Sequence, residues 1–189
     1  MIIGDIVQYL AMIAIGLIGA NGSGKSSVCT YLHEKGYVVF SLSDIVRDEA
    51  RQNGLALDRD NLVSTANALK KQEGQDVLAR RVMSTVELSI AEDVVFDSIR
   101  NVAETEFLKS RGVRLLGLEV SLQSRYDRIK TRQGDTDQVD FVTFSRQDER
   151  EASGSSFGQH INACLPYCDT IISNDGTLDD LYAKVDQFL

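Results

Sequence analysis

The 189-residue chain is long enough to bury a core of its own and is the length of one domain. Its 20 basic and 28 acidic residues leave a formal charge of −8, which argues against a protein that holds nucleic acid mainly by attraction to the phosphate backbone. Any bound nucleotide is therefore expected to be a small molecule. The three cysteines are too few for a disulfide framework, so we expect packing residues in a protein of the reducing cytoplasm.

The first 20 residues are apolar enough to raise the question of a targeting or membrane segment. Asp5 and Gln8 interrupt the run, no Lys or Arg precedes it, and it continues directly into a glycine-rich loop. Neither a signal peptide nor a membrane-spanning helix has that pattern, so we expect no membrane partner. Met12 stands directly before the first predicted strand. Residues 1–11 are therefore expected to be an extension or the product of an upstream start codon.

The strongest motif is the octapeptide at 19–26, which follows the apolar run 13–18 and precedes a helical pattern over 25–35. This order of strand, loop and helix is the context of a phosphate-binding P-loop, a glycine-rich loop that ends in Gly-Lys-Ser. The glycines let backbone N–H groups surround an anion, and the helix N-terminus adds partial positive charge. We expect Lys25 to reach the β and γ phosphates of ATP and Ser26 to contact Mg²⁺. The residues expected to bind the nucleotide here are Gly19, Ala20, Asn21, Gly22, Ser23, Gly24, Lys25, Ser26 and Ser27.

The rest of the chain alternates apolar strands with helical patterns. Apolar runs predict further strands at 37–42, 94–97, 113–120 and 169–173. Helical spacing predicts a helix at 44–51 capped by Ser43, two more divided at Gly74, one after Ser121, one at 141–151, and a closing helix after Thr177 that turns Leu178, Leu181, Val185 and Phe188 inward. This alternation predicts an α/β fold with a doubly wound, five-stranded parallel sheet. We expect a single domain over 1–189, with a helical acceptor-binding region at 44–90 and a lid region at 133–158.

Ligands of such a sheet bind beyond the carboxyl ends of its strands. The P-loop, Asp44, Asp97 and Asn174 each follow or end a predicted strand, so they are expected to converge on that edge.

A P-loop alone does not distinguish a GTPase, a transport ATPase and a small-molecule kinase. The Asn-Lys-x-Asp and Asp-x-x-Gly motifs of GTPases and the Leu-Ser-Gly-Gly-Gln signature of transport ATPases are missing from the sequence. A phosphotransferase needs cations around the moving phosphoryl group and a cover that excludes water. The predicted stripe of Arg125, Arg128 and Arg132, the polar loop 134–140, and Arg146 with Arg150 match these needs. Solvated arginines on an exposed face are the alternative.

From Met12 onward the chain resembles the nucleoside-monophosphate-kinase-like branch of the P-loop kinases. Within that branch it is most similar to short archaeal kinases related to adenylate kinase and dephospho-CoA kinase. The segment Ser43-Asp44-Ile45-Val46-Arg47 resembles their acceptor helix, which implies that Arg47 holds the phosphate of the acceptor. Asp97-Ser98-Ile99-Arg100 resembles the end of the third strand of adenylate kinases. There Ser98 replaces a glycine, the proline of the pattern is missing, and Arg100 comes one residue early, so AMP is not singled out as the acceptor.

Further segments carry the same resemblance. Arg128 to Arg132 resembles the lid-entry helix, Arg150 the arginine beyond the lid, and Asn174-Asp175-Gly176 the adenine-side loop. For Asp44 the resemblance implies an acid that orients or deprotonates an acceptor hydroxyl, but hydrogen bonding to the start of its own helix stays equally open. For Asp97 it implies contact with Mg²⁺ through water, or else a structural role.

The resemblance therefore implies an ATP- and Mg²⁺-dependent phosphotransferase that moves the γ-phosphoryl group to a nucleotide or nucleotide-like acceptor. The residues implied are Lys25, Asp44, Arg128, Arg132 and Arg150 for catalysis, Asp44, Arg47 and Arg100 for the acceptor, Asn174 for the nucleotide, and Ser26 and Asp97 for the metal. Dephospho-CoA kinase is an alternative. An ATP-binding interaction module without useful transfer is an alternative of another class. The identity of the acceptor and the oligomeric state are not predicted.

Overall fold

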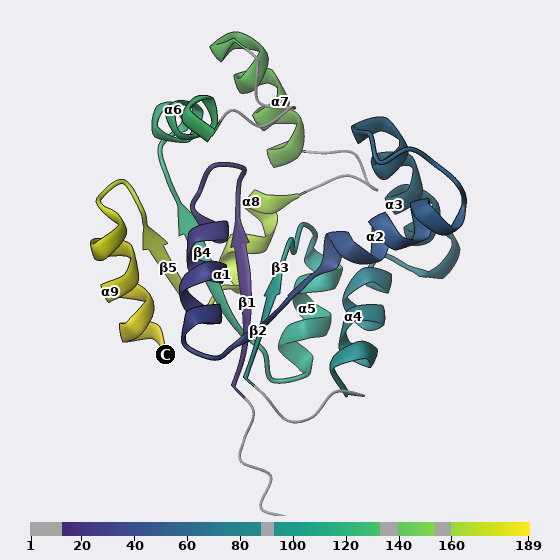
Figure 1. Ribbon diagram of the computed structural model, residues 1–189, viewed down its shortest axis with the longest axis horizontal. Helices are drawn as coiled ribbons and strands as arrows, with labels where there is room; N and C mark the ends of the chain where they lie inside the picture. The colour runs from purple at the N-terminus through teal and green to yellow at the C-terminus, as the bar shows by residue number, and fades with distance from the viewer. Residues whose placement is uncertain (1–12, 88–92, 133–139, 154–159) are drawn as a thin grey trace, which may run out of the picture.

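A five-stranded parallel sheet organises the protein (Figure 1). The computed structural model describes residues 13–87, 93–132, 140–153 and 160–189. The strands are β1 Ala14–Gly19, β2 Val38–Ser41, β3 Val94–Asp97, β4 Arg114–Glu119 and β5 Thr170–Ser173. They lie in the order β2-β3-β1-β4-β5, and every neighbouring pair is parallel. The predicted doubly wound α/β sheet is confirmed.

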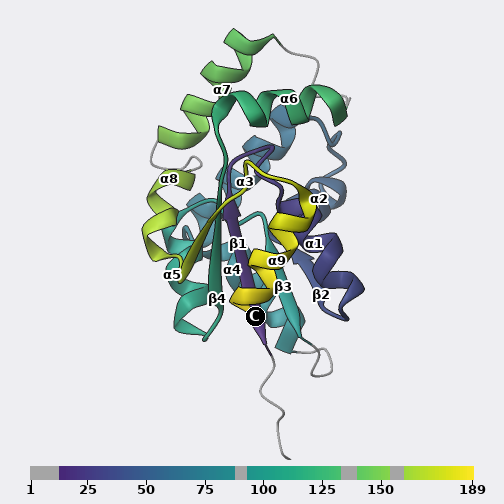
Figure 2. The same cartoon turned by 90° about the vertical axis from the view of Figure 1, so that its left-hand side faces the viewer.

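Helices cover both faces of this sheet. They are α1 Lys25–Glu34, α2 Leu42–Gln52, α3 Arg59–Glu73, α4 Val77–Glu87, α5 Val102–Ser110, α6 Leu122–Arg132, α7 Phe141–Ser153, α8 Ile161–Cys164 and α9 Leu178–Phe188, with a 3₁₀ turn at Leu165–Tyr167. In Figure 2, α1 and α9 lie on one side of the sheet and α5 and α8 on the other. Helices α6 and α7 lie beyond the carboxyl ends of the strands. Across the described residues, no helix combines the length and apolarity needed to cross a membrane.

The central strands are buried on both faces, as their unbroken apolar sequence predicts. Along β1, Ile15 and Leu17 pack towards α1 and α9, while Ala14 and Ile18 belong to the second core cluster, under α2, α4, α5 and α8. The edge strands β2 and β5 are less buried than the central strands, because each pairs with a neighbouring strand on one side only. Strand β2 is half-buried throughout, and β5 buries only Ile172 of its four side chains, so the apolar run at 37–42 does not form the fully buried strand that its composition favours.

Several local expectations need correction. Helix α2 begins at the buried Leu42, so Ser41 rather than Ser43 occupies the N-cap position. Leu178 is 56% exposed instead of packing inward, although the cap at Thr177 is confirmed by reciprocal hydrogen bonds with Asp180. Helices α5 and α8 were not predicted. For α5 a signal was present, because Asn101 accepts a 2.9 Å hydrogen bond from the main-chain N–H of Glu104, the pattern of a helix N-cap.

Candidate nucleotide-binding site

The glycine-rich segment forms a tight turn between β1 and α1. Gly22 and Gly24 have φ angles of 79° and 100°, a region that glycine adopts without strain. A Cβ atom at Gly22 would lie 2.8 Å from the main-chain oxygen of Arg125, so the backbone approach there excludes a side chain. Gly24 is also the N-cap residue of α1 and offers no side chain to cap it. The N–H groups and the positive end of the helix dipole can therefore serve an anion.

Lys25 is the first residue of α1, and its side chain points back to the start of this turn. Its Nζ donates hydrogen bonds to the main-chain oxygens of Gly19 at 2.7 Å and Ala20 at 3.0 Å. The ammonium group is thereby held against the same loop whose N–H groups can bind an anion.

A cavity of about 720 Å³ opens beside the turn. One wall is the P-loop from Asn21 to Ser27, a second is α6, and a third is the segment joining β5 to α9. Outside the P-loop its lining residues are Asp127, Arg128, Ile129, Thr131, Asn174, Gly176, Thr177 and Leu178. The structure thus brings most of the predicted nucleotide-binding residues, including Asn174, to one cavity, together with Arg128, which was predicted to act in catalysis.

Asn174 links the walls of the cavity. Its side-chain amide donates to the main-chain oxygen of Ser23 at 2.9 Å, and its own main-chain oxygen accepts a 2.7 Å hydrogen bond from Arg128. The residue is 5% exposed. Its amide therefore supports the P-loop from behind, in addition to lining the cavity.

Arg125 departs from the predicted arginine stripe. Its guanidinium is buried in a bidentate ion pair with Asp148 of α7, whereas Arg128 lines the cavity. Arg146 is exposed on α7. The side chains of Arg132 and Arg150 lie outside the described part of the structure, as do residues 1–11 and much of the predicted lid region 133–158.

Two buried oxygens at this edge of the sheet have no hydrogen-bond partner among the described residues, Ser23 Oγ and Asp97 Oδ1. The other carboxylate oxygen of Asp97 accepts a hydrogen bond of 3.2 Å from Ser98, whose hydroxyl lies 3.1 Å from that of Ser41. Burial raises the pKa of the nearby Cys29 thiol to about 12; the charge of Asp97 adds to this effect and that of Lys25 opposes it. Cys29 is therefore a protonated packing residue beside the site.

The predicted acceptor residues do not line this cavity. Asp44 and Arg47 form an exposed ion pair of 2.6 Å on α2. Arg100 follows β3, and both of its main-chain groups are fixed: its N–H donates to Glu104 Oε2 at 2.9 Å, and its oxygen accepts from the N–H of His160 at 2.8 Å.

Glu104 was not singled out from the sequence, although it fixes the backbone at Arg100. It is 1% exposed and pairs with the buried Lys70 of α3, which is 6% exposed, at 3.4 Å. Burial raises the pKa of its carboxyl group, and the charge of Lys70 opposes that rise. Charged residues are usually assigned to the surface from sequence alone, so only the Asn-x-x-Glu cap pattern at 101–104 could have drawn attention to it.

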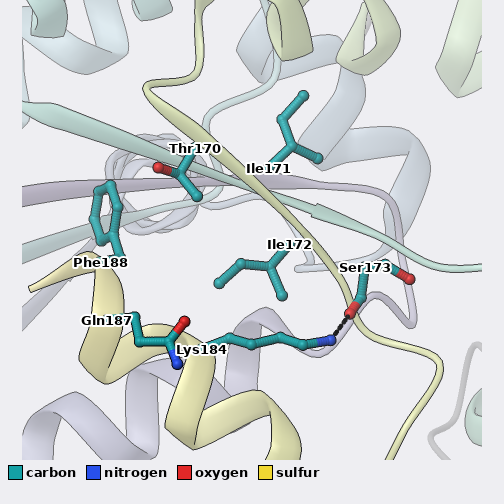
Figure 3. A pocket seen from close by; sticks show the side chains of 7 residues that line it. All are labelled: Thr170, Ile171, Ile172, Ser173, Lys184, Gln187 and Phe188. Carbon is teal, nitrogen blue, oxygen red and sulfur yellow. Dashed lines mark hydrogen bonds between the residues drawn. The ribbon is translucent and has the colours of Figure 1, made fainter.

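A second hollow of about 360 Å³ lies between β5 and α9 (Figure 3). Lys184 crosses it and donates a 2.7 Å hydrogen bond to the main-chain oxygen of Ser173. Neither the P-loop nor a helix N-terminus lines this hollow, so it lacks the groups that make the first cavity suitable for a phosphate.

A doubly wound parallel sheet with a P-loop after its first strand is the fold of P-loop kinases. Residues 15–152 match the family model AAA_18, described as an AAA domain. A UPF0200 protein of Methanococcus maripaludis is 30% identical over 178 residues, which cover 93% of this chain and 94% of that protein. The chain therefore belongs to the UPF0200 proteins and carries the AAA_18 domain.

Other relatives place limits on this comparison. A UPF0200/UPF0201 protein of Archaeoglobus fulgidus is 32% identical over 187 residues. The match covers 96% of this chain but only 56% of that longer protein. Among solved structures, TT1252 of Thermus thermophilus is similar with a TM-score of 0.62 at 21% identity, covering 94% of this chain and 96% of that one. Shikimate kinase from Acinetobacter baumannii, in complex with shikimate, has a TM-score of 0.56 at 17% identity, covering 95% and 94%. These two structures establish the fold alone. The broad P-loop kinase resemblance is confirmed, whereas the adenylate kinase and dephospho-CoA kinase subgroups are not singled out.

Proposed function

We propose that the protein is an ATP- and Mg²⁺-dependent phosphotransferase of the cytoplasm that moves the γ-phosphoryl group to a nucleotide or nucleotide-like small molecule. The observation that carries the proposal is the cavity of about 720 Å³, which has the P-loop as one wall and Arg128 in another. We expect a nucleotide to bind between them with its phosphates on the loop. Lys25 would neutralise the β and γ phosphates, and Arg128 would add a second positive charge.

The residues present fit a magnesium ion. Mg²⁺ is usually held by one or two protein oxygens together with phosphate oxygens and water. Ser26 lines the cavity, and the buried Asp97 Oδ1 has no hydrogen-bond partner among the described residues, as expected of a carboxylate that serves an ion or its water. When bound there, the metal would offset the charge on the transferring phosphoryl group.

The acceptor would lie towards α2 and the end of β3. Arg47 is a candidate for its phosphate, and Arg100, whose main chain is fixed on both sides, is a second candidate. If the acceptor group is a hydroxyl, Asp44 could orient or deprotonate it. If the acceptor group is a phosphate, no base is required, and the role of Asp44 is its ion pair with Arg47.

Two other functions compete with this proposal. Dephospho-CoA kinase uses the same machinery with a different acceptor. An ATP-binding interaction module would bind nucleotide without useful transfer; the Archaeoglobus relative favours it, because its UPF0200-like part lies within a longer protein described by two family names.

The test is a panel of acceptors with γ-labelled ATP and Mg²⁺. Transfer to CMP, dCMP, UMP or AMP supports the proposal, transfer to dephospho-CoA alone supports the first alternative, and tight ATP binding without transfer supports the second. Lys25→Met should abolish transfer. Lys184→Met is the matched control, because Lys184 also donates to a main-chain oxygen but lies at the second hollow. Unchanged turnover in Lys25→Met would refute the role given to this lysine.

A further inference from the structure

The side chain of Arg125 contacts three other parts of the chain: α7, the residue that follows β4, and the P-loop. It projects from α6, is 8% exposed, and forms two parallel hydrogen bonds with the carboxylate of Asp148 on α7, one of them 2.7 Å long. Its Nε donates to the main-chain oxygen of Val120 at 3.3 Å, and Nη1 also donates to the main-chain oxygen of Asn21 at 3.4 Å. The ring of Phe144 lies 5.8 Å from the guanidinium.

The contact with Asn21 has a consequence for the loop. In a trans peptide the C=O and the next N–H point in opposite directions, and the described residues contain no cis peptide. Because the oxygen of Asn21 is directed to the guanidinium of Arg125, which does not line the nucleotide cavity, the N–H of Gly22 in the same peptide is directed away from Arg125. Asn21 and Gly22 both line the nucleotide cavity, so that side is where a phosphate would lie.

The backbone of Arg125 reinforces this orientation. Its main-chain oxygen and Cα stand where a Cβ at Gly22 would lie, at 2.8 and 3.1 Å. The peptide between Asn21 and Gly22 is thus enclosed by one residue through both its main chain and its side chain. A rotation of that peptide would break the hydrogen bond to the guanidinium.

Asp148 determines whether Arg125 can do this. A buried guanidinium is tolerated only when its charge is paired and its donors are satisfied, and a bidentate carboxylate does both. Arg125 and Asp148 are not among the residues that line the nucleotide cavity. Among the described residues, Asp148 is connected to the nucleotide cavity through Arg125 and the loop.

We propose that Arg125, held by Asp148, is a positioning residue that orients the Asn21–Gly22 peptide for phosphate binding. This inference rests on the proposed function only in requiring that the P-loop binds a nucleoside triphosphate.

The experiment measures ATP·Mg²⁺ affinity by calorimetry on the full chain, under conditions where circular dichroism shows each variant to be folded. Asp148→Asn and Arg125→Gln should each weaken binding about tenfold, the effect expected from losing one oriented donor. The double variant should bind ATP no more weakly than either single variant, because both substitutions remove the same support for the Asn21–Gly22 peptide. Asp48→Asn is the matched control, since Asp48 also pairs with an arginine, Arg51, but on the exposed face of α2.

Conservative variants keep the test decisive if the first ones do not fold. Arg125→Lys keeps the charge next to Asp148 but lacks the planar guanidinium, so it loses the bidentate pairing that fixes the position of the donor to Asn21. It should fold and still lose affinity several-fold, whereas Asp148→Glu should retain more affinity than Asp148→Asn. If the wild-type chain binds no ATP, the proposed function fails and this inference falls with it. If the wild type binds ATP and the folded Arg125 and Asp148 variants bind it equally well, the inference alone is overturned.

Discussion

The side-chain amide of Asn174 donates a 2.9 Å hydrogen bond to the main-chain oxygen of Ser23, which lies 151 positions earlier in the chain. The same amide occupies the space that a Cβ at Gly24 would need. The turn after the last strand of the sheet therefore closes against the loop after the first strand. Because the bond is buried, the conformation of the P-loop depends on a residue from the far end of the sequence.

Asn174→Ala should destabilise the fold and weaken ATP binding. It leaves the oxygen of Ser23 buried without this donor, a loss that costs about 1–3 kcal/mol. Urea unfolding and calorimetry measure the two effects. Asn53→Ala is the control, since the side-chain amide of Asn53 donates a long hydrogen bond, 3.4 Å, to Glu49 on the exposed surface. An Asn174→Ala protein with wild-type stability and affinity would show that the bond does not support the loop.

The sequence predicted those parts of the protein that depend on neighbouring residues. The P-loop can be recognised from its own glycines and the flanking apolar strand alone, and β3 was placed at its observed limits because a short apolar run ends there at Asp97. The roles of Arg125 and Glu104 were not predictable in this way. Helical spacing put Arg125 on a face with Arg128, but its partner Asp148 is 23 positions away and meets it only after folding. Likewise, nothing in the local sequence shows that Lys70 and Glu104 are buried together.

Ser98 is the one non-glycine residue in the described part of the chain with a positive φ, at 65°. The resemblance to adenylate kinases places a glycine at this position, which agrees with the observed conformation. Ser98→Ala keeps the strained backbone and removes the hydroxyl contacts with Ser41 and Asp97. Ser98→Gly removes the same contacts and also the strain, so it should be more stable than Ser98→Ala by about 1 kcal/mol. Chemical denaturation of the pair compares them directly, and an alanine variant at least as stable as the glycine variant would contradict the assignment of strain.

Lys70→Met should be strongly destabilising, because it leaves the carboxylate of Glu104 buried without its counter-charge. Removing one partner of a buried pair costs about 3–5 kcal/mol, and Lys70→Met/Glu104→Gln should recover much of that loss. Lys109→Met is the matched control: it removes an exposed pair with Asp169 and should cost about 1 kcal/mol or less.

The loss of stability in Lys70→Met should depend on pH. Burial raises the pKa of Glu104 above its ordinary value of 4.5. The stability linked to its protonated form is therefore complete below pH 4.5 and is lost as the pH rises towards the raised pKa. The deficit of Lys70→Met should accordingly be smaller at pH 4 than at pH 7 in urea denaturation. A deficit that is equal at both values would mean that the charge of Glu104 is not what the lysine offsets.

Asp97→Asn separates a role with magnesium from a structural one. The substitution keeps the shape of the side chain and removes its charge, and the buried Oδ1 has no described hydrogen-bond partner to lose. ATP affinity in the presence of Mg²⁺ should fall about tenfold, while affinity measured in EDTA should stay the same or rise, because a negative charge near the phosphates is gone. Asp93→Asn is the control, because Asp93 lies at the opposite end of β3, where it accepts a 2.7 Å hydrogen bond from the N–H of Ile13 that an asparagine oxygen can replace. An equal loss with and without Mg²⁺ would show that Asp97 acts on the loop itself and not through a metal ion.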